Sequence, residues 1–504
     1  MANIRRRTVL KSFGAVASTA LGSTSAQSAP PIVQSELTPQ QFGASGGDAT
    51  ADTLGWNRAV AEGARLGRPV MASGTYVLRA PAKSRWNWFR RPSATTHVAV
   101  QLHSHTRIFA KNCTILVGRP EVPPISKDER HILFGTDESI ESGALTDIEF
   151  EGLTFDFREE FGPVHSFTYA VGIVGVDDFK RRNVTVTSTG TLAGRGLLSQ
   201  NTRRRTDIGL KHVNIVQGIY TRYETGVVMR DISFDKFNEA LDFDGPCSDV
   251  TLDGLQFRNG FREAQCIDTA AGDRWTISGV RAENTGPIVM IYVKANGWPT
   301  YRQWLENGDK HPATFVVPSN WTVRDVWGRN VGGTLKSRGE TLGESLRVGT
   351  YRNEHWFKRQ RGGPSPKNIT IENWTLENSA PIAVNDCENL TMKNIVMSDP
   401  RTLDDKEAGA ALVLREPKPD FGGQVTGSVS DVTIRNSRGM GVSAVAGRGL
   451  RLDNITVDGY NLSGGQQTNA GIRLRSRPGG YDRPELGRTA IKGGKGNDLD
   501  SSSK

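Results

Sequence analysis

The chain has 504 residues, 36% of them hydrophobic, with 56 glycines and a formal net charge of +9. This composition favours a turn-dense β fold over a helical one, and no apolar run reaches the roughly 18 residues of a membrane span. Four of the positive charges lie within residues 5–11. The rest of the chain is therefore compatible with an anionic polymer as partner but is too weakly basic to indicate nucleic acid.

The first 29 residues have the three parts of an export signal. A basic segment at 5–11 is followed by a mild apolar run at 13–21 and by small residues at 23–29. The pair Arg6-Arg7, followed by one residue, an apolar pair and a lysine, resembles the twin-arginine signal. The resemblance implies recognition by the twin-arginine translocation machinery and cleavage after Ala26 or slightly later. A mature protein acting in the periplasm or outside the cell would follow. The alternative is a disordered basic tail.

Residues 30–80 predict a cap that precedes a repetitive fold. Phe-Gly-Ala-Ser-Gly-Gly-Asp at 42–48 leads to an apolar pattern of helical period at 52–66, for which Asp52 or Thr53 would be the N-cap. Gly67 and a following proline would end this helix. Two short strands at 70–72 and 74–78 come next.

This order of elements resembles the opening of the pectate-lyase superfamily and of polygalacturonase-like and phage tailspike proteins. There, a Phe-Gly-Ala-x-Gly-Asp-Gly segment, an Asp-Thr-capped helix and a Gly-x-Tyr strand begin a right-handed parallel β-helix. The chain departs from it at Gly47-Asp48-Ala49 and Ala51-Asp52. The resemblance implies a fold rather than a reaction, because lyases, hydrolases, epimerases and binding proteins share it.

A repeat is visible in the middle of the chain. Short apolar segments at 232–234, 250–252 and 276–277 are each followed by turn residues and a second extended run, at 240–244, 265–269 and 288–294. Their anchor residues 234, 252 and 277 lie 18 and 25 positions apart, a period that predicts an all-β parallel β-helix over 81–465. Stacked coils align equivalent residues as an outer ladder. Residues 466–504, rich in Gly, Arg and Ser, predict a disordered tail.

Asn or Asp often precedes the predicted strands, where its side chain can bond turn backbone. Examples are Asn183, Asp207, Asp249, Asn320, Asn368, Asn389 and Asp431. Cys247 and Cys266 lie one repeat apart and could form a disulfide, although buried free thiols are the expectation for both, and Cys113 and Cys387 have no obvious partners.

Three insertions, near 84–97, 296–319 and 336–364, combine aromatic with basic residues. Aromatic rings stack on sugars and guanidinium groups bind carboxylates or sulfates, so the insertions suit a saccharide groove. The alternative is that the rings pack against the coils. The candidate substrate-binding residues are, in two of these insertions, Trp298, Tyr301, Trp304, Arg338, His355, Trp356 and Arg359 and, outside the insertions, Arg222 and Tyr223.

The candidate chemistry lies in the central repeat. Asp242 and Asp244 alternate on one strand and face outward if Leu241 and Phe243 face the core. Asp268 occupies the corresponding run of the next coil, about 4.8 Å away. We expect the three carboxylates to gather and their repulsion to raise at least one pKa. Paired carboxylates of this kind predict a glycoside hydrolase, and a wide separation predicts inversion.

The same residues partly resemble the polygalacturonase-like hydrolases, which carry an Asn-x-Asp strand, an Asp pair one coil on, a His and an Arg-x-Lys. Asp242-Phe243-Asp244 and Asp268 match the first two, and Lys294 lies where a basic subsite residue is expected. Gly286-Pro287-Ile288 replaces the usual Gly-His-Gly. The resemblance implies catalytic roles for the three aspartates and Lys294.

Two alternatives use the same surface. A uronate lyase would neutralise the sugar carboxylate and abstract a proton with groups such as Arg222, Tyr223, Lys294, Arg338 or His355. It would use either basic residues or Ca²⁺ held by the three aspartates as neutraliser. A non-catalytic glycan-binding or cell-surface protein is the third hypothesis. No metal site is firmly predicted.

Overall fold

The computed structural model describes most of the chain from residue 36 onward. The described residues are 36–81, 85–86, 95–121, 129–136, 144–158, 167–190, 192–261, 264–269, 271–291, 298–307, 316–332, 335–337, 340–349, 365–402, 409–415, 425–445, 449–464, 470–475 and 483–501. The predicted export signal at 1–29 lies outside them and stays a prediction.

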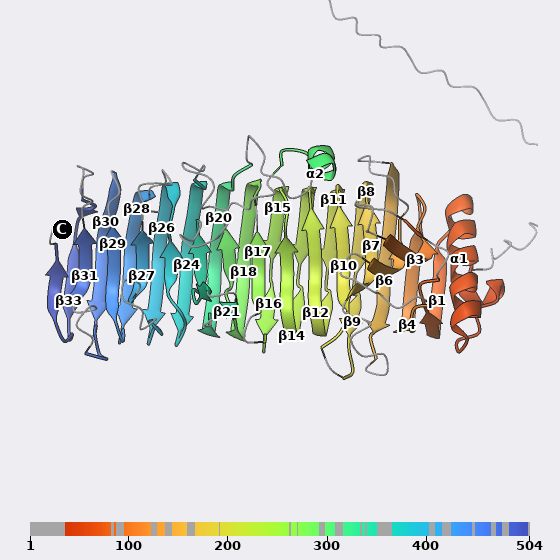
Figure 1. Ribbon diagram of the computed structural model, residues 1–504, viewed down its shortest axis with the longest axis horizontal. Helices are drawn as coiled ribbons and strands as arrows, with labels where there is room; N and C mark the ends of the chain where they lie inside the picture. Colours follow the sequence, from red (N-terminus) through yellow and green to blue (C-terminus); the bar gives the residue numbers. More distant parts are fainter. Residues whose placement is uncertain are drawn as a thin grey trace, which may run out of the picture. The chain divides into compact units, whose positions relative to one another are not determined.

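Residues from Leu37 onward form one compact unit. Its coil-forming strands stack in chain order from helix α1 (Ala49–Leu66) and pair in parallel with strands of the neighbouring coils (Figure 1). This arrangement confirms the predicted parallel β-helix. No helix among the described residues is long and apolar enough to cross a membrane.

Three series of parallel strands build the coils. The first series consists of β1 (Val70–Leu78), β4 (Arg107–Val117), β6 (Leu145–Asp156), β8 (Val176–Arg182), β11 (Arg203–Ile208), β13 (Thr225–Arg230), β15 (Ser248–Asp253), β18 (Asp273–Thr285), β20 (Ser319–Val331), β24 (Lys367–Glu377), β26 (Cys387–Ser398), β28 (Val425–Arg435), β30 (Leu450–Asp458) and β32 (Glu485–Leu486). The second series consists of β9 (Thr185–Thr187), the first parts of β12 (Lys211–Arg222) and β14 (Ser233–Phe243), β16 (Gln256–Arg258), β33 (Thr489–Lys492) and the later parts of the long first-series strands.

The third series carries the candidate chemistry. It consists of β3 (Thr95–Gln101), β5 (Glu129–Gly135), β7 (Thr168–Val174), β10 (Arg195–Gln200), the later parts of β12 and β14, β17 (Gln265–Thr269), β19 (Val289–Ile291), β23 (Leu346–Val348), β25 (Ile382–Val384), β27 (Ala410–Arg415), β29 (Met440–Val445), β31 (Ala470–Arg475) and β34 (Asn497–Asp500). The short elements outside the three series are η1 (Pro39–Phe42), β2 (Arg85–Trp86), α2 (Tyr301–Asn307), β21 (Leu335–Ser337) and β22 (Glu340–Leu342). Of these, β2, α2, β21 and β22 lie in the three predicted insertions.

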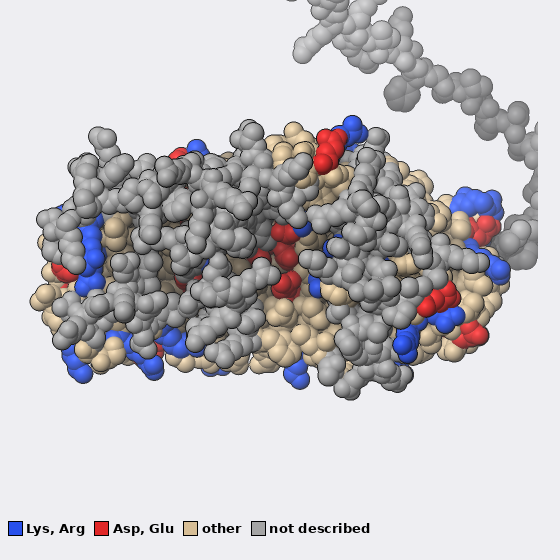
Figure 2. Space-filling view, viewed as in Figure 1, with Lys and Arg blue, Asp and Glu red and all other residues tan. Residues whose placement is uncertain are grey.

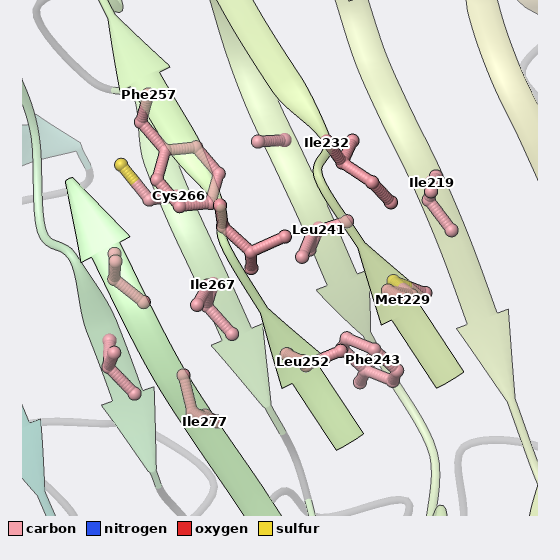
Figure 3. Packing of buried hydrophobic residues seen from close by; sticks show 14 of the residues in the cluster. Ile219, Met229, Ile232, Leu241, Phe243, Leu252, Phe257, Cys266, Ile267 and Ile277 are labelled. Atoms are coloured by element: carbon pink, nitrogen blue, oxygen red, sulfur yellow. The ribbon is translucent and has the colours of Figure 1, made fainter. Parts of the chain in front are cut away.

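Inward side chains form continuous rows along the stack. In the third series Leu241 pairs with Ile219 of the previous coil and Ile267 of the next, and all three are fully buried (Figure 3). In the first series Leu252 lies between Met229 and Ile277 in the same way. Burial of this apolar surface is worth about 25 cal/mol per Å² and is shared between coils.

The predicted pairing of residue 234 with residue 252 is wrong. Phe234 pairs with Phe257 in the second series, while Leu252 belongs to the first. Each coil carries one apolar segment for each of the three series. The spacing of 18 residues between 234 and 252 therefore compared a segment of the second series with one of the first. The second extended runs, by contrast, align as predicted.

Asparagine and aspartate hold the bends between strands. Asn320, Asn368 and Asn389 all adopt left-handed backbone with φ between 53° and 59°, which asparagine tolerates better than most residues. Asn368 donates to Asn320 and Asn389 donates to Asn368, each at 2.8 Å. Asp325 and Asn373 repeat this at the bend inside β20 and β24. These side chains bond between coils, whereas the sequence predicted bonds to turn backbone, and Asp207, one of the predicted examples, forms a buried ion pair with Arg181 instead.

Helix α1 covers the first coil, as predicted, but its N-cap is Asp48 rather than Asp52 or Thr53. Asp48 accepts from the backbone N–H groups of Thr50 and Ala51 at 2.7 and 3.0 Å. The apolar pattern starts one turn after the helix does, because the residues of the first turn contribute little to the core. Gly67, with φ of 64°, ends it as predicted.

Asp52 instead ties the cap to the first strand. Its fully buried carboxylate accepts from the backbone N–H groups of Ser45, Gly46 and Val77 at 2.7 to 2.8 Å. Three charge-assisted bonds explain why a carboxylate is retained inside the fold.

The predicted disordered tail at 466–504 is wrong for its described part. Strands β31, β33 and β34 pair in parallel with earlier coils and end the stack. Ile472 and Leu474 are buried in the core. Few residues of this segment face inward, so its composition resembles that of a polar tail. All four cysteines fall within the described residues and are buried free thiols.

Candidate functional site

Two carboxylates stand side by side on the outer face of the third series. Asp242 of β14 pairs in register with Asp268 of β17, so their backbones are neighbours at about 4.8 Å. Leu241 and Phe243 are fully buried, as predicted, which turns Asp242 outward. Asp268 is 6% exposed. Acidic side chains are visible at the middle of the face shown in Figure 2, in the region of β14 and β17. The predicted adjacency of Asp242 and Asp268 is confirmed, and the gathering of Asp244 with them and the catalytic role of the three stay predictions.

Asp244, just beyond the end of β14, is bound by two donors from the previous coil. The Tyr220 hydroxyl donates to its Oδ2 at 2.8 Å, and the Arg222 guanidinium forms an ion pair with the same oxygen. Burial alone would lower the pKa of Arg222, but Asp244 raises it above its ordinary value. Asp244 is therefore held as an acceptor by two donors, which suits a positioning role better than that of a proton donor.

Glu239 joins this row and was missed by the sequence analysis. The buried side chain of Gln217 donates through Nε2 to Glu239 Oε2 at 2.6 Å and to Asp242 Oδ2 at 3.2 Å, so the two carboxylates share one amide. Ala240 and Leu241 are consecutive and both fully buried. The alternation therefore breaks, and Glu239 faces the same side as Asp242.

A sequence signal for this break exists. The position of Ala240 is occupied by Gly196 and Gly218 in the two preceding coils, each followed by an aliphatic residue. A Cβ on Gly218 would approach the core ring of Phe234 to 2.3 Å, which shows that this small residue also points inward. A small residue followed by an aliphatic one marks the irregularity in each coil.

Three arginines lie on the side of the carboxylates nearer the N-terminal coils. Arg195 donates to Gln217 Oε1 and packs on the rings of Phe167 and Tyr169, each 5.6 Å away. Burial lowers the pKa of Arg130, and the like charges of Arg222 and Arg195 lower it further. Burial also opposes the charge of Arg195, yet its pKa is raised by Tyr169 and by the carboxylates of Glu239 and Asp242. The arginines and the carboxylates of Glu239 and Asp242 thus lie next to each other on the same outer surface.

Helix α2 packs against this surface. Tyr301 and Trp304 are 5% and 2% exposed, and the Arg222 guanidinium lies 4.4 Å from the Trp304 ring. Tyr301 donates to Gln200 Oε1 at 2.8 Å, and the Tyr223 ring lies 5.6 Å from that of Tyr301. The rings of Tyr301 and Trp304 therefore pack against the coils and leave little surface for a sugar. Trp298 and Tyr223, partly buried in the same cluster, retain some exposure.

Several predicted site residues fall outside the described residues, and their roles stay predictions. These are Lys294, Arg338, His355, Trp356 and Arg359. Among the described residues no group of three or more His, Cys, Asp or Glu side chains is arranged to hold a metal ion. The predicted alternative of Ca²⁺ held by three aspartates stays a prediction.

Comparison with known proteins places the fold. No protein-family model matches the chain, and no curated protein matches it. A mutant tailspike protein of E. coli bacteriophage HK620 in complex with a pentasaccharide is similar, with TM-score 0.53 and 10% identity over 90% of this chain and 78% of the tailspike. A second mutant of that tailspike gives TM-score 0.50 and 12% identity over 84% of this chain and 76% of the other. The Family 28 exopolygalacturonase of Yersinia enterocolitica gives TM-score 0.45 and 12% identity over 92% of this chain and 78% of the enzyme. The two tailspike similarities support the parallel β-helix predicted from the sequence.

Proposed function

We propose that the protein is a polysaccharide-active enzyme that hydrolyses a glycosidic bond. The single observation that carries the proposal is the outward pair Asp242 and Asp268 in register on neighbouring strands, extended by Glu239. Carboxylates gathered on one outer wall supply the acid and base of glycoside hydrolysis. A saccharide-bound protein of the same fold lends support.

We propose inversion at the anomeric carbon as the stereochemical outcome. Inverting enzymes separate their carboxyls by about 6.5–9.5 Å, whereas retaining enzymes keep them about 5–5.5 Å apart. Asp242 and Asp268 lie on adjacent strands, at a spacing nearer the second range. Inversion would therefore use Asp268 with Glu239, which lies three residues before Asp242 on the same strand, and Asp242 would orient the water. The anomer formed first, followed by NMR, identifies the working pair: retention would assign Asp242 and Asp268.

The substrate we propose carries acidic groups. Arg130, Arg195 and Arg222 lie together beside the carboxylates, and mutual repulsion contributes to the lowered pKa of Arg130. A sugar carboxylate or sulfate bound there would relieve that repulsion and place the neighbouring glycosidic bond over the acidic row. Digestion of a panel of neutral and acidic polysaccharides tests this, and cleavage of neutral polymers alone would contradict it.

The lyase alternative is less well supported by the described residues. Burial raises the pKa of the phenols of Tyr220 and Tyr223, so both are protonated near neutral pH and are poor bases. Arg222, in turn, is bound to Asp244. Elimination would leave an unsaturated product that absorbs near about 235 nm, whereas hydrolysis gives reducing ends without that absorbance.

Neutral amide variants of the carboxylates test the site. Asp242→Asn, Asp268→Asn and Glu239→Gln should each lower kcat by at least about 100-fold, the scale of a lost general acid or base, while oligosaccharide binding is retained. Asp249→Asn is the matched control, because this exposed aspartate pairs with Arg274 on the first series. Product formation unchanged in all three site variants would remove the proposed site. Binding without products in the wild type would favour the glycan-binding hypothesis.

We further propose that residues 1–29 direct export by the twin-arginine route and that the mature protein acts outside the cytoplasm. The support is the arrangement of Arg6-Arg7 before an apolar segment. Replacing both arginines by lysine should retain the full-length protein in the cytoplasm, as seen by fractionation. Export of this variant at the wild-type level would contradict the proposal.

A further inference from the structure

The interior of the first series is apolar except close to the candidate site. Arg181 and Asp207 are in register there, in the row that Met229 occupies one coil later. Arg205 lies in the neighbouring inward row, in which Val227 takes the equivalent position one coil later. The fold therefore accepts apolar residues at these positions, and the charges in the earlier coils need another explanation.

The charged residues form one continuous chain, which we call the buried ion chain: Arg181, Asp207, Arg205 and Glu224. Arg181 Nε donates to Asp207 Oδ1 at 2.8 Å, and Arg205 lies 3.6 Å from Asp207 Oδ2 and 3.0 Å from Glu224 Oε2. The Ser199 hydroxyl also donates to Glu224. All four charged residues are buried. Apolar replacements of such groups are often equally stable or more stable, so stability alone does not account for them.

The buried ion chain ends beside a strained corner of the backbone, at Tyr223. Tyr223 has φ of 55°, in the left-handed region that few residues other than glycine and asparagine adopt. The preceding coils place Gly175 and Asn201 at the same corner, with φ of 67° and 52°. Arg222, immediately before Tyr223, reaches Asp244 on the outer face, whereas Glu224, immediately after, enters the core. A bulky residue in this conformation persists only where its surroundings hold it.

We propose that the buried ion chain is a positioning device that holds the Arg222–Tyr223–Glu224 corner, so that Arg222 stays directed at Asp244 beside the catalytic carboxylates. Glu224 is its anchoring residue and touches no substrate. The inference rests on the proposed function for its catalytic consequence, but the positioning itself does not depend on any reaction. Outside the corner, the ring of Tyr223 packs near Tyr301 and Trp304, which holds the corner from the other side.

The test replaces one ion pair of the chain by apolar side chains. The double variant Arg205→Met with Glu224→Leu leaves the pair of Arg181 and Asp207 in place and should remain folded. Two amides at the corner report on it: Asn201 N–H donates to Arg222 O at 2.9 Å, and Asp244 N–H donates to Thr221 O at 3.1 Å. We expect these amides to exchange hydrogen at least about tenfold faster than in the wild type, with the exchange of distant strands unchanged.

Kinetics give the second readout. The double variant should lose at least about tenfold in kcat and should also raise KM, because Arg222 holds Asp244 and belongs to the arginines proposed to bind the acidic sugar. Arg473→Met with Asp500→Leu is the matched control, because this pair links β31 and β34 in the last coil. The control should leave both the corner amides and kcat unchanged.

Wild-type exchange at Asn201 and Asp244 in the folded double variant would overturn the positioning role. If the double variant does not fold, the single variant Glu224→Gln, which removes only the negative charge that faces Arg205, is measured by the same hydrogen exchange with the same two outcomes. A wild type that cleaves no polysaccharide would remove the proposed function, while the exchange measurement would still decide the positioning role.

Discussion

Two regions of the stack follow the same coil geometry with very different residues. In the coils of β24, β26 and β28, the inward row Ile371, Met392 and Val429 is apolar and Asn373 turns the bend. In the coils of β8, β11 and β12, ion pairs occupy the interior and the large Tyr223 occupies a left-handed corner. The regular coils show what the fold requires. Departures that gather beneath one outer surface therefore indicate a requirement of that surface rather than of folding.

The largest expected effect comes from breaking the charge balance of the irregular region. Asp207→Asn leaves Arg181 and Arg205 buried with Glu224 as the remaining acidic member of the chain. Burial opposes ionisation of Asp207, but the two guanidinium groups lower its pKa, so the carboxylate is charged in the native state. Removing one partner of a buried ion pair costs about 3–5 kcal/mol. Denaturant unfolding followed by circular dichroism measures this loss.

Asp249→Asn is the control for that variant. Asp249 forms its ion pair with Arg274 on the exposed outer face, where such pairs contribute little. The unfolding midpoint of this variant should stay close to that of the wild type. Equal destabilisation by the two substitutions would show that the interior charges are no more demanding than surface charges, and the contrast between the regions would fail.

A smaller effect is expected at His212, a further polar residue in the interior of the irregular region. Its ring stacks on Phe234 at 4.7 Å, and neither ring nitrogen has a hydrogen-bond partner among the described residues. Burial, with a contribution from Arg181, lowers its pKa to about 3. Between about pH 6.5 and pH 3 the unfolded chain therefore binds a proton that the folded chain does not, and stability falls as the pH falls.

Replacing His212 tests this sign. Between about pH 7 and pH 4 the wild type should lose on the order of 2–4 kcal/mol through this residue, and His212→Phe should not show that loss. Because the new ring is larger and Gly196 lies against it, His212→Leu serves as a second variant. An unchanged acid dependence in both variants would mean that His212 is not the residue responsible.

The sequence predicted the fold well because its signals are local. The capping helix, the glycine that ends it and the parallel coils follow from apolar period and turn residues, and the adjacency of Asp242 and Asp268 follows from strand alternation. The N-cap was misplaced because the first turn of α1 has little apolar pattern. The last coil was missed because few of its residues, such as Ile472 and Leu474, face the core.

The rest of the candidate site depends on geometry that alternation does not contain. Glu239 faces Asp242 only because two consecutive residues turn inward between them. The role of Gln217 appears only when strands one coil apart are placed side by side. The burial of Tyr301 and Trp304 depends on where α2 packs, which a loop composition rich in aromatics does not determine.

The smallest expected effect lies in the regular region and sharpens the contrast from the other side. Asn373 adopts φ of 57°, donates to Asp325 at 2.8 Å and accepts from Asn394 at 3.0 Å. Asn373→Ala removes two exposed hydrogen bonds and puts alanine in left-handed backbone, so we expect a loss of about 1–2 kcal/mol, less than for Asp207→Asn. Asn373→Gly, which loses the same bonds without the steric cost, separates the two contributions in denaturant unfolding. If alanine and glycine are equally destabilising, the hydrogen-bonded row rather than backbone preference holds the bends. If neither has an effect, the bends are fixed by the buried rows alone, and the asparagines of the regular coils are dispensable.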